Sequence, residues 1–212
     1  PPFFFFHHKT AYQMLRSLVG SEMCIRDRER IIRLLNEEWQ TGKFEYKVRE
    51  EKFKEQGEEM LAIYFDNIKK SPPSVVETEY DFSFQIDNIT IVGTIDRIDQ
   101  NGDNGISITD YKTSKTPTKA KNSLQLAIYS LYLEQSQDSM ISGSPISSNL
   151  YFLRNDDDPI SMHTFNAEEL ESVKDKIVDV SMGIKNKNFK PEKGNHCNWC
   201  DYKDLSCPAW ED

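Results

Sequence analysis

Two aspartates and a lysine stand close together near the middle of the chain, in the segments GTIDRID and ITDYKTS. Alternate side chains of an extended segment point to the same side, so Asp110 and Lys112 share one face. Carboxylates are the hard oxygen ligands that Mg²⁺ and Mn²⁺ prefer, and Asp96 and Asp110 supply two of them. The backbone carbonyl of Tyr111 would add a third oxygen. This set of residues predicts a divalent-metal site.

The reaction that such a site favours is phosphodiester hydrolysis. A bound metal ion makes a nucleophile of its water and neutralises charge on the phosphoryl oxygens. Lys112 would orient that water and stabilise the developing negative charge, and Glu79, on the solvent face of an earlier strand, could assist. The alternative is that these residues are surface acids near strand ends with Lys112 as their ion-pair partner.

A group of lysines follows the candidate site directly. Lys112, Lys115, Lys119 and Lys121 lie within ten residues of one another. The formal net charge of −9 argues against a protein whose whole surface binds nucleic acid. The position of the lysine group nevertheless favours phosphate binding by the last three of them. A solvated loop is the alternative.

The candidate residues are expected to lie on a three-stranded meander. Alternation of apolar and polar residues predicts strands over Val75–Ile86, Ile89–Ile98 and Ile106–Thr113, separated by short turns. Asp96 lies shortly before the second turn, whereas Asp110 lies near the far end of the third strand. We therefore expect sheet twist or a bulge to bring the two carboxylates together.

Helices are predicted on both sides of this meander in the sequence. Apolar residues at helical spacing mark Ile31–Trp39 and Met60–Ile68 before it, and 117–135 and Leu170–Ile184 after it. The segment Asn149–Arg154 is typical of a fourth strand. Because it follows a crossover helix, we expect it to lie parallel to a neighbour. The fold class is thus α/β, with a mixed central sheet and helices on both faces.

GTIDRID, an Asn/Gly-rich turn, ITDYKTS and then QLAIY together resemble the RecB-like branch of the PD-(D/E)XK nuclease superfamily. The resemblance covers residues 29–212 and is strongest over 75–132. It implies a core like that of restriction endonucleases, with Asp96 and Asp110 as metal ligands and Lys112 as the catalytic lysine.

The same resemblance assigns a role to a pair of residues on the helix that follows. Gln125 and Tyr129 match the family's QxxxY motif, which lines the active site and the path of the DNA strand. They lie one helical turn apart, so their side chains are neighbours. An ordinary polar helix edge is the alternative.

The start of the chain departs from the family pattern. The family usually places a metal-binding histidine in a helix before the segment seen here as IIRLLNEEW, and no histidine matches it. Residues 1–28, which include His7, His8 and Cys24, instead resemble translated library-adapter sequence. We expect a non-native segment there, followed by a nuclease domain over 29–212. A genuine amphipathic helix around Met14–Val19 is the alternative.

Three cysteines near the end of the chain form a C-x2-C-x6-C pattern: Cys197, Cys200 and Cys207. Such close spacing favours metal binding over disulfides. The pattern, within residues 190–212, resembles the C-terminal part of the four-cysteine 4Fe-4S cluster of AddB and of CRISPR adaptation nucleases. The fourth ligand is then missing or is Cys24. A zinc site completed by His196 is the alternative.

The site residues predict a Mg²⁺- or Mn²⁺-dependent phosphodiesterase, and the resemblance implies a deoxyribonuclease that acts on single-stranded DNA or DNA ends. The resemblance further implies a repair or recombination enzyme with a helicase module or subunit as partner. The alternatives are a free-standing nuclease of the CRISPR adaptation type and a catalytically silent DNA-binding scaffold domain. No apolar run approaches the ~20 residues needed to cross a bilayer, and no secretory signal is evident, so we expect a soluble cytoplasmic protein.

Overall fold

The structure is a computed structural model of the whole chain. It describes residues 25–39, 41, 46–102, 105–136, 138, 141, 145–203 and 205–210. The predictions for residues 1–24, including His7, His8, Cys24 and the Met14–Val19 helix, lie outside this described part. The chain divides into two compact units, Pro1–Val173 and Lys174–Asp212, which are described separately below.

In the described part of the chain, five strands form one mixed sheet in the order β1-β2-β3-β4-β5. The strands are β1 (Val75–Ile86), β2 (Ile89–Asn101), β3 (Gly105–Lys112), β4 (Ser147–Phe152) and β5 (Ile160–His163). Neighbouring strands are antiparallel except β3 and β4, which are parallel. The predicted meander and the parallel fourth strand are confirmed. The fifth strand was not predicted, because four residues are too few for a periodic pattern to stand out.

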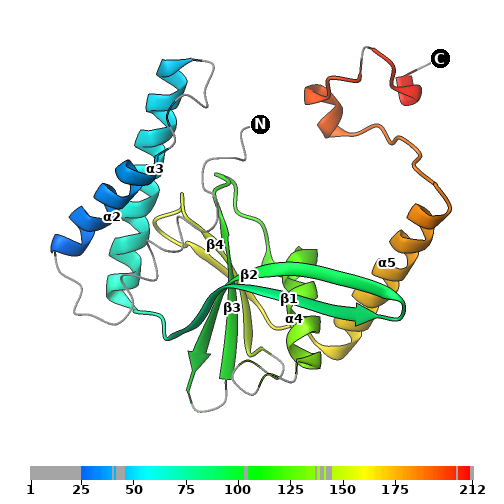
Figure 1. Cartoon of the computed structure of the whole chain (residues 1–212), viewed down its shortest axis with the longest axis horizontal. Coiled ribbons are helices and arrows are strands. Elements are labelled where there is room, and N and C mark those ends of the chain that lie inside the picture. The colour runs from blue at the N-terminus through cyan, green and yellow to red at the C-terminus, as the bar shows by residue number, and fades with distance from the viewer. Residues whose placement is uncertain are drawn as a thin grey trace. The chain divides into compact units, whose positions relative to one another are not determined.

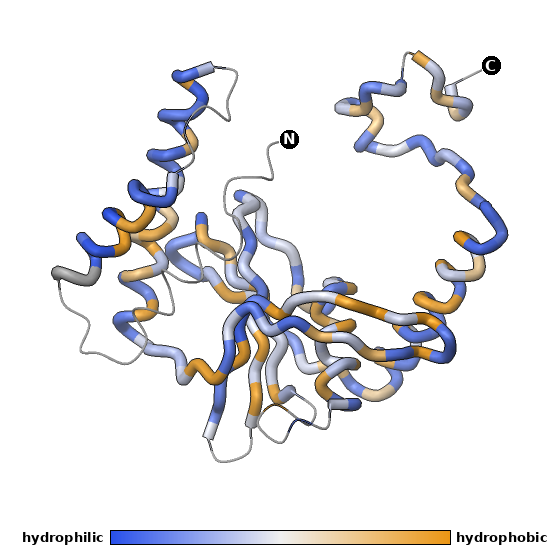
Figure 2. The backbone as a smooth tube through the Cα atoms, in the orientation of Figure 1, coloured by the Kyte–Doolittle hydropathy of each residue, from blue (hydrophilic) through white to orange (hydrophobic). Residues whose placement is uncertain are grey.

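Two helices precede the sheet, as predicted: α2 (Ile25–Glu38) and α3 (Lys47–Lys70). They run side by side (Figure 1) and bury a cluster that contains Ile31 and Leu61. The first half of α3 is mostly hydrophilic, whereas its second half carries the apolar residues (Figure 2). That second half places Tyr64 against Tyr151 of β4, so α3 covers one face of the sheet.

The helix α4 (Leu124–Gln135) lies in sequence between the two parallel strands and contacts β1, β3 and β4. We predicted a start at residue 117, but the helix begins at Leu124 after a short 3-10 turn. Ser123 caps it, since its Oγ accepts a hydrogen bond from the amide of Leu126 over 3.3 Å. Leu124, the first residue of the helix, is 41% exposed, whereas Leu126 is buried.

The last helix, α5 (Ala167–Lys185), begins with a reciprocal cap and spans the junction of the two units. The Glu169 amide donates to Asn166 Oδ1 over 2.9 Å, and the Asn166 amide donates to Glu169 Oε2 over 3.0 Å. The second unit continues with short 3-10 turns at Asn195–Trp199 and Pro208–Trp210. None of the helices in the described residues is long and apolar enough to span a membrane.

Candidate active site on strands β2 and β3

The pairing of β2 with β3 brings the two candidate metal ligands together. Arg97 pairs with Thr109, and the next position in the same register sets Asp96 opposite Asp110. Both aspartates are buried, at 7% and 2% exposure. The expectation that twist or a bulge must join them is wrong. The hairpin remains paired up to the neighbouring residues, so its register alone makes the carboxylates neighbours.

A third carboxylate stands in line with these two on β1. Thr78 pairs with Arg97, and the following position sets Glu79 opposite Asp96. Glu79 has a φ of +49°, a left-handed conformation that is rare for a residue other than glycine and costs on the order of 1 kcal/mol. Glu79 is half-buried, like its neighbours in the first half of β1, and its Oε1 is buried, so our placement of it on the solvent face is wrong.

Lys112 balances the buried charge of Asp110. Its Nζ lies 2.5 Å from Asp110 Oδ2, while 34% of the lysine side chain stays exposed. Asp110 and Lys112 are two residues apart on β3 and so share a face, as predicted. The ion pair thus combines a buried carboxylate with an ammonium group that reaches towards solvent, and a substrate phosphate can approach that group.

A chain of hydrogen bonds leads from Lys112 onto α4. Lys112 Nζ donates to Gln125 Oε1 over 2.9 Å, and Gln125 Nε2 donates to the hydroxyl of Tyr129 over 2.6 Å. That hydroxyl in turn donates to the carbonyl of Thr94 on β2 over 2.8 Å. The structure therefore brings Gln125 and Tyr129 to the same place as the two aspartates and the lysine.

The hydroxyl of Tyr129 is electrostatically coupled to the site. Burial raises its pKa first, and the negative charges of Asp110 and Asp96 raise it further. Tyr129 is therefore a neutral phenol at physiological pH. Both carboxylates act on one hydroxyl from α4, in agreement with the strand register that places them side by side.

Aromatic rings support Tyr129 from the β1 side. The ring of Phe82 stacks on Tyr132, with centroids 4.8 Å apart, and meets Tyr129 edge-on at 5.6 Å. Gly93 on β2 makes room for this arrangement, because a Cβ there would lie 2.7 Å from the Phe82 ring. The three rings form a wall that holds α4 against the β1-β2 hairpin.

The donor set fits a hard divalent cation. Two buried carboxylates lie on adjacent strands, and Mg²⁺ is typically held by one or two carboxylates together with waters and substrate phosphates. Within the described residues, no group of three or more His, Cys, Asp or Glu side chains is arranged to hold a metal ion. The protein side of the site would thus consist of Asp96 and Asp110, and the role of the Tyr111 carbonyl stays a prediction.

The predicted DNA-binding lysines occupy the connection from β3 to α4. Lys115 and Lys119 are exposed. Lys121 is exposed as well, but its Nζ lies 3.9 Å from Glu169 Oε1 at the start of α5. An exposed pair of this kind contributes little stability. All three lysines are accessible to a polyanion, and their contact with DNA remains a prediction.

The three cysteines of the second unit are free thiols. Cys197 is buried, and Cys200 and Cys207 are half-buried. Across the part of the chain that the structure describes, these thiols are not gathered into a metal-holding group. The arrangement provides no support for either a 4Fe-4S cluster or a zinc site with His196, so both remain predictions.

Sequence reasoning missed a second set of polar residues, on the opposite face of β2 and β3. Arg97 and Asp99 are only 8% and 5% exposed, although both are charged. Their positions on either side of Ile98, in a segment that alternation predicts to be a strand, were the available signal. An arginine and an aspartate two residues apart on a strand share one face and can pair there.

Comparison with protein families agrees with this geometry. A family model described as the PD-(D/E)XK nuclease superfamily matches residues 6–208, which is most of the chain. The mixed sheet and its flanking helices are those of a nuclease-type α/β protein. The chain belongs to the PD-(D/E)XK nuclease superfamily. No curated protein matches the chain significantly. Nucleases of this superfamily generally use Mg²⁺ or Mn²⁺, and the family suggests DNA as the substrate.

Proposed function

We propose that the chain is a Mg²⁺- or Mn²⁺-dependent deoxyribonuclease in which Asp96 and Asp110 hold the metal ion and Lys112 is the catalytic lysine. One observation carries the proposal. Lys112 Nζ contacts both Asp110 Oδ2, at 2.5 Å, and Gln125 Oε1, at 2.9 Å. An ammonium group fixed in this way beside two buried carboxylates suits phosphodiester hydrolysis better than a structural ion pair, which would gain nothing from partial exposure.

Each residue has a role that follows from its contacts. When bound, the metal ion would supply Lewis acidity and lower the pKa of a water. The Lys112 ammonium is held in place before substrate arrives, so its charge stabilises developing negative charge without reorganisation. The neutral Tyr129 hydroxyl holds the Gln125 amide, and that amide orients Lys112. Glu79 is a third carboxylate in line with the two ligands.

The substrate path proposed here runs from the active site across the start of α4. Gln125 is exposed on that helix, and Lys115 and Lys119 are exposed on the loop before it. Lysines on a loop contact phosphates without reading bases, so the expected binding is salt-dependent and tolerant of sequence. Single-stranded DNA or DNA ends are the proposed substrate, in keeping with the QxxxY motif of Gln125 and Tyr129.

We also infer a RecB-like subtype from the segments GTIDRID, ITDYKTS and QLAIY. A helicase module or subunit is then the proposed partner, and recombinational repair the proposed setting. For the second unit we propose an iron-sulfur cluster on Cys197, Cys200 and Cys207, supported by their spacing. Anaerobically purified protein should then be brown, with broad visible absorption. Colourless protein that contains zinc would overturn that assignment.

The nuclease proposal is tested by cleavage of end-labelled single- and double-stranded DNA in the presence of Mg²⁺, Mn²⁺ or EDTA. Cleavage that needs metal and is abolished by Lys112→Ala would support it. Lys70→Ala is the matched control, because Lys70 is exposed at the end of α3 and is not part of the site. Folded wild-type protein that leaves every DNA intact under all conditions would contradict it and favour a silent DNA-binding domain.

A further inference from the structure

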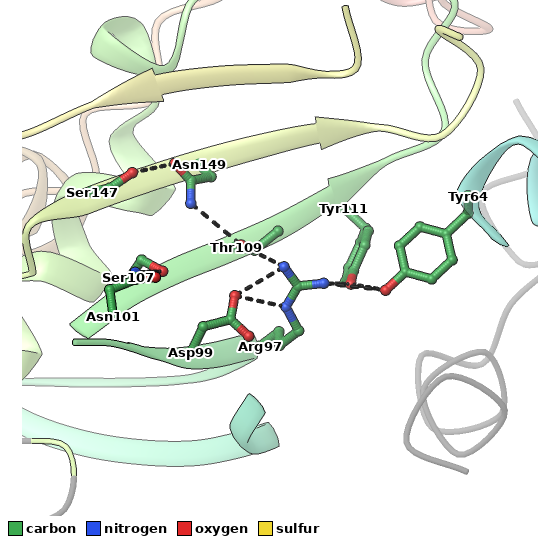
Figure 3. Close-up of polar contacts among 9 residues, drawn as sticks. All are labelled: Tyr64, Arg97, Asp99, Asn101, Ser107, Thr109, Tyr111, Ser147 and Asn149. Atoms are coloured by element: carbon green, nitrogen blue, oxygen red, sulfur yellow. Dashed lines mark hydrogen bonds and ion pairs between the residues drawn. The ribbon is translucent and has the colours of Figure 1, made fainter. Parts of the chain in front are cut away.

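A buried polar cluster lies on the face of the sheet opposite the candidate active site. We call it the arginine cluster: Arg97, Asp99, Thr109, Tyr111 and Tyr64 (Figure 3). Arg97 and Asp99 come from β2, Thr109 and Tyr111 from β3, and Tyr64 from α3. The cluster therefore links the two strands that carry the metal ligands to the helix that covers their other face.

The guanidinium of Arg97 is the centre of the cluster. Its Nε and Nη2 both lie 2.9 Å from Asp99 Oδ2. Its Nη1 donates to the hydroxyl of Tyr64 over 3.1 Å and also to the hydroxyl of Tyr111. Its Nη2 donates to Thr109 Oγ1 over 3.4 Å. A planar fork of donors makes all these contacts at once, which a lysine cannot do.

The charges of the cluster are set by burial and by one another. Burial raises the pKa of the Asp99 carboxyl, against the opposing effect of the Arg97 guanidinium. Burial also raises the pKa of both tyrosines, so their hydroxyls stay neutral and can accept from Arg97. The cluster is thus one buried ion pair with neutral hydroxyls around the cation. Such a pair is a costly way to gain stability alone, because both charges must be desolvated.

Tyr111 connects this cluster to the active-site face. It lies between Asp110 and Lys112 on β3, so its side chain points to the face opposite theirs. While Arg97 holds its hydroxyl, its backbone amide donates to Asp96 Oδ2 over 2.8 Å. Tyr111, the residue between Asp110 and Lys112, is therefore held at two points: Arg97 binds its hydroxyl, and the Asp96 carboxylate binds its backbone amide.

We propose that Arg97 is a positioning residue for the divalent metal. By holding the Tyr111 hydroxyl it fixes the Tyr111 amide against Asp96, and this sets the geometry of the Asp96 and Asp110 carboxylates. Arg97 itself touches neither metal nor DNA. The proposal rests on the metal site of the proposed function. It adds that metal affinity depends on a contact on the far face of the sheet.

Binding of Mn²⁺ to the full chain, measured by calorimetry without DNA, tests this directly. Arg97→Lys keeps the charge but cannot reproduce the fork of contacts, and Tyr111→Phe removes the hydroxyl alone. Each should weaken Mn²⁺ binding about tenfold. The double variant should also bind Mn²⁺ about tenfold more weakly than wild type and no worse, because the contact that matters for the metal, between Arg97 and the Tyr111 hydroxyl, is already lost in each single variant.

Thr109→Val is the matched control for this titration. It removes another Arg97 contact and leaves the Tyr111 hydroxyl in place, so its Mn²⁺ affinity should stay within about twofold of wild type. Unchanged affinity in folded Arg97→Lys protein, or additive losses in the double variant, would overturn the proposal and leave Arg97 with a purely structural role. Tyr111→Phe keeps the ring, so it supplies the answer if Arg97→Lys does not fold.

Amide hydrogen exchange in metal-free protein separates this proposal from the proposed function. The residue 111 amide should exchange at least about tenfold faster in both variants, while the amides of Ile98 and Ile108 keep their wild-type rates. Wild-type protein that neither binds Mn²⁺ nor cleaves DNA would defeat the proposed function, yet faster exchange at residue 111 would still uphold the positioning contact. Unchanged exchange at residue 111 in both folded variants would refute that contact whatever the activity.

Discussion

Lys112 Nζ and Gln125 Oε1 lie 2.9 Å apart, and this contact joins the end of β3 to the first turn of α4. Gln125 is exposed and fills no part of the core, so Gln125→Ala should fold normally. It would remove one hydrogen-bond partner from the lysine ammonium, which keeps Asp110, and one from the Tyr129 hydroxyl, which keeps the Thr94 carbonyl. A hydrogen bond to a charged group contributes about 1.5 kcal/mol, so we expect cleavage roughly tenfold slower under single-turnover conditions.

Asn122→Ala is the control for that measurement, because Asn122 is exposed in the turn just before α4. It should cleave at the wild-type rate. Equal rates for Gln125→Ala and wild type at saturating metal would show that the lysine does not need this contact.

Asp110→Asn should abolish the stabilisation of the folded protein by Mn²⁺. A ligand that binds only the folded state at about ten times its Kd stabilises that state by about 1.4 kcal/mol. For a chain of this size that raises the melting temperature by about 4 °C. Wild type should show this rise with Mn²⁺ and Asp110→Asn should not. Asp66→Asn, an exposed change on α3, should respond like wild type. A full Mn²⁺ response in Asp110→Asn would remove this residue from the metal site.

Gly93→Ala should destabilise the folded protein, because it crowds the aromatic rings of Phe82, Tyr129 and Tyr132. The added Cβ would lie 2.7 Å from the Phe82 ring. That ring is 6% exposed and packed against Tyr129 and Tyr132, so it has little room to move. Overpacking of this kind costs about 1–3 kcal/mol in free energy of unfolding. Urea denaturation measures it.

Gly183→Ala provides the contrast for that substitution. A Cβ at Gly183 on α5 meets no atom within 4 Å, and alanine favours a helix over glycine by up to about 1 kcal/mol. This variant should be as stable as wild type or slightly more so. If both alanine variants had the same stability, the close contact between Gly93 and Phe82 would carry no energetic weight.

Glu169 should contribute a pH-dependent part of the stability at the start of α5. Its hydrogen bond from the Asn166 amide lowers its pKa below the ordinary value, and His163 lowers it further. The folded state then binds the proton more weakly than the unfolded state. The contribution is therefore present above the unfolded pKa of 4.5. It is lost as pH falls through the lower folded pKa.

Melting temperatures at pH 6 and at successively lower pH values test this sign. Glu169→Gln should lower the melting temperature at pH 6 and show a smaller further drop on acidification than wild type. Glu168→Gln removes the same charge from the neighbouring residue and should keep the wild-type pH dependence. A steeper acid loss in Glu169→Gln than in wild type would contradict the direction of the pKa shift.

Local patterns predicted most of the elements and the residue types of the site. Alternation along Val75–Ile86 and apolar spacing in the helices identified their elements, because burial of one face imposes a period of two or 3.6. Element ends were less certain. The helix α4 begins after Ser123 and not at residue 117, because the free amides of a helix start need a side-chain acceptor, which the Ser123 hydroxyl supplies.

The sequence by itself pointed to the candidate side chains: Asp96, Asp110 and Lys112 within GTIDRID and ITDYKTS, and Gln125 and Tyr129 one helical turn apart. Only the tertiary structure decided that the β2-β3 register makes the aspartates neighbours and that Arg97 holds the Tyr111 hydroxyl on the far face of the sheet. It also gave Glu79 its left-handed conformation. These relationships depend on the pairing register of the strands, on one unusual backbone conformation and on contacts between side chains of neighbouring strands. Their free energies come from burial and desolvation at those contacts, and no local pattern records them.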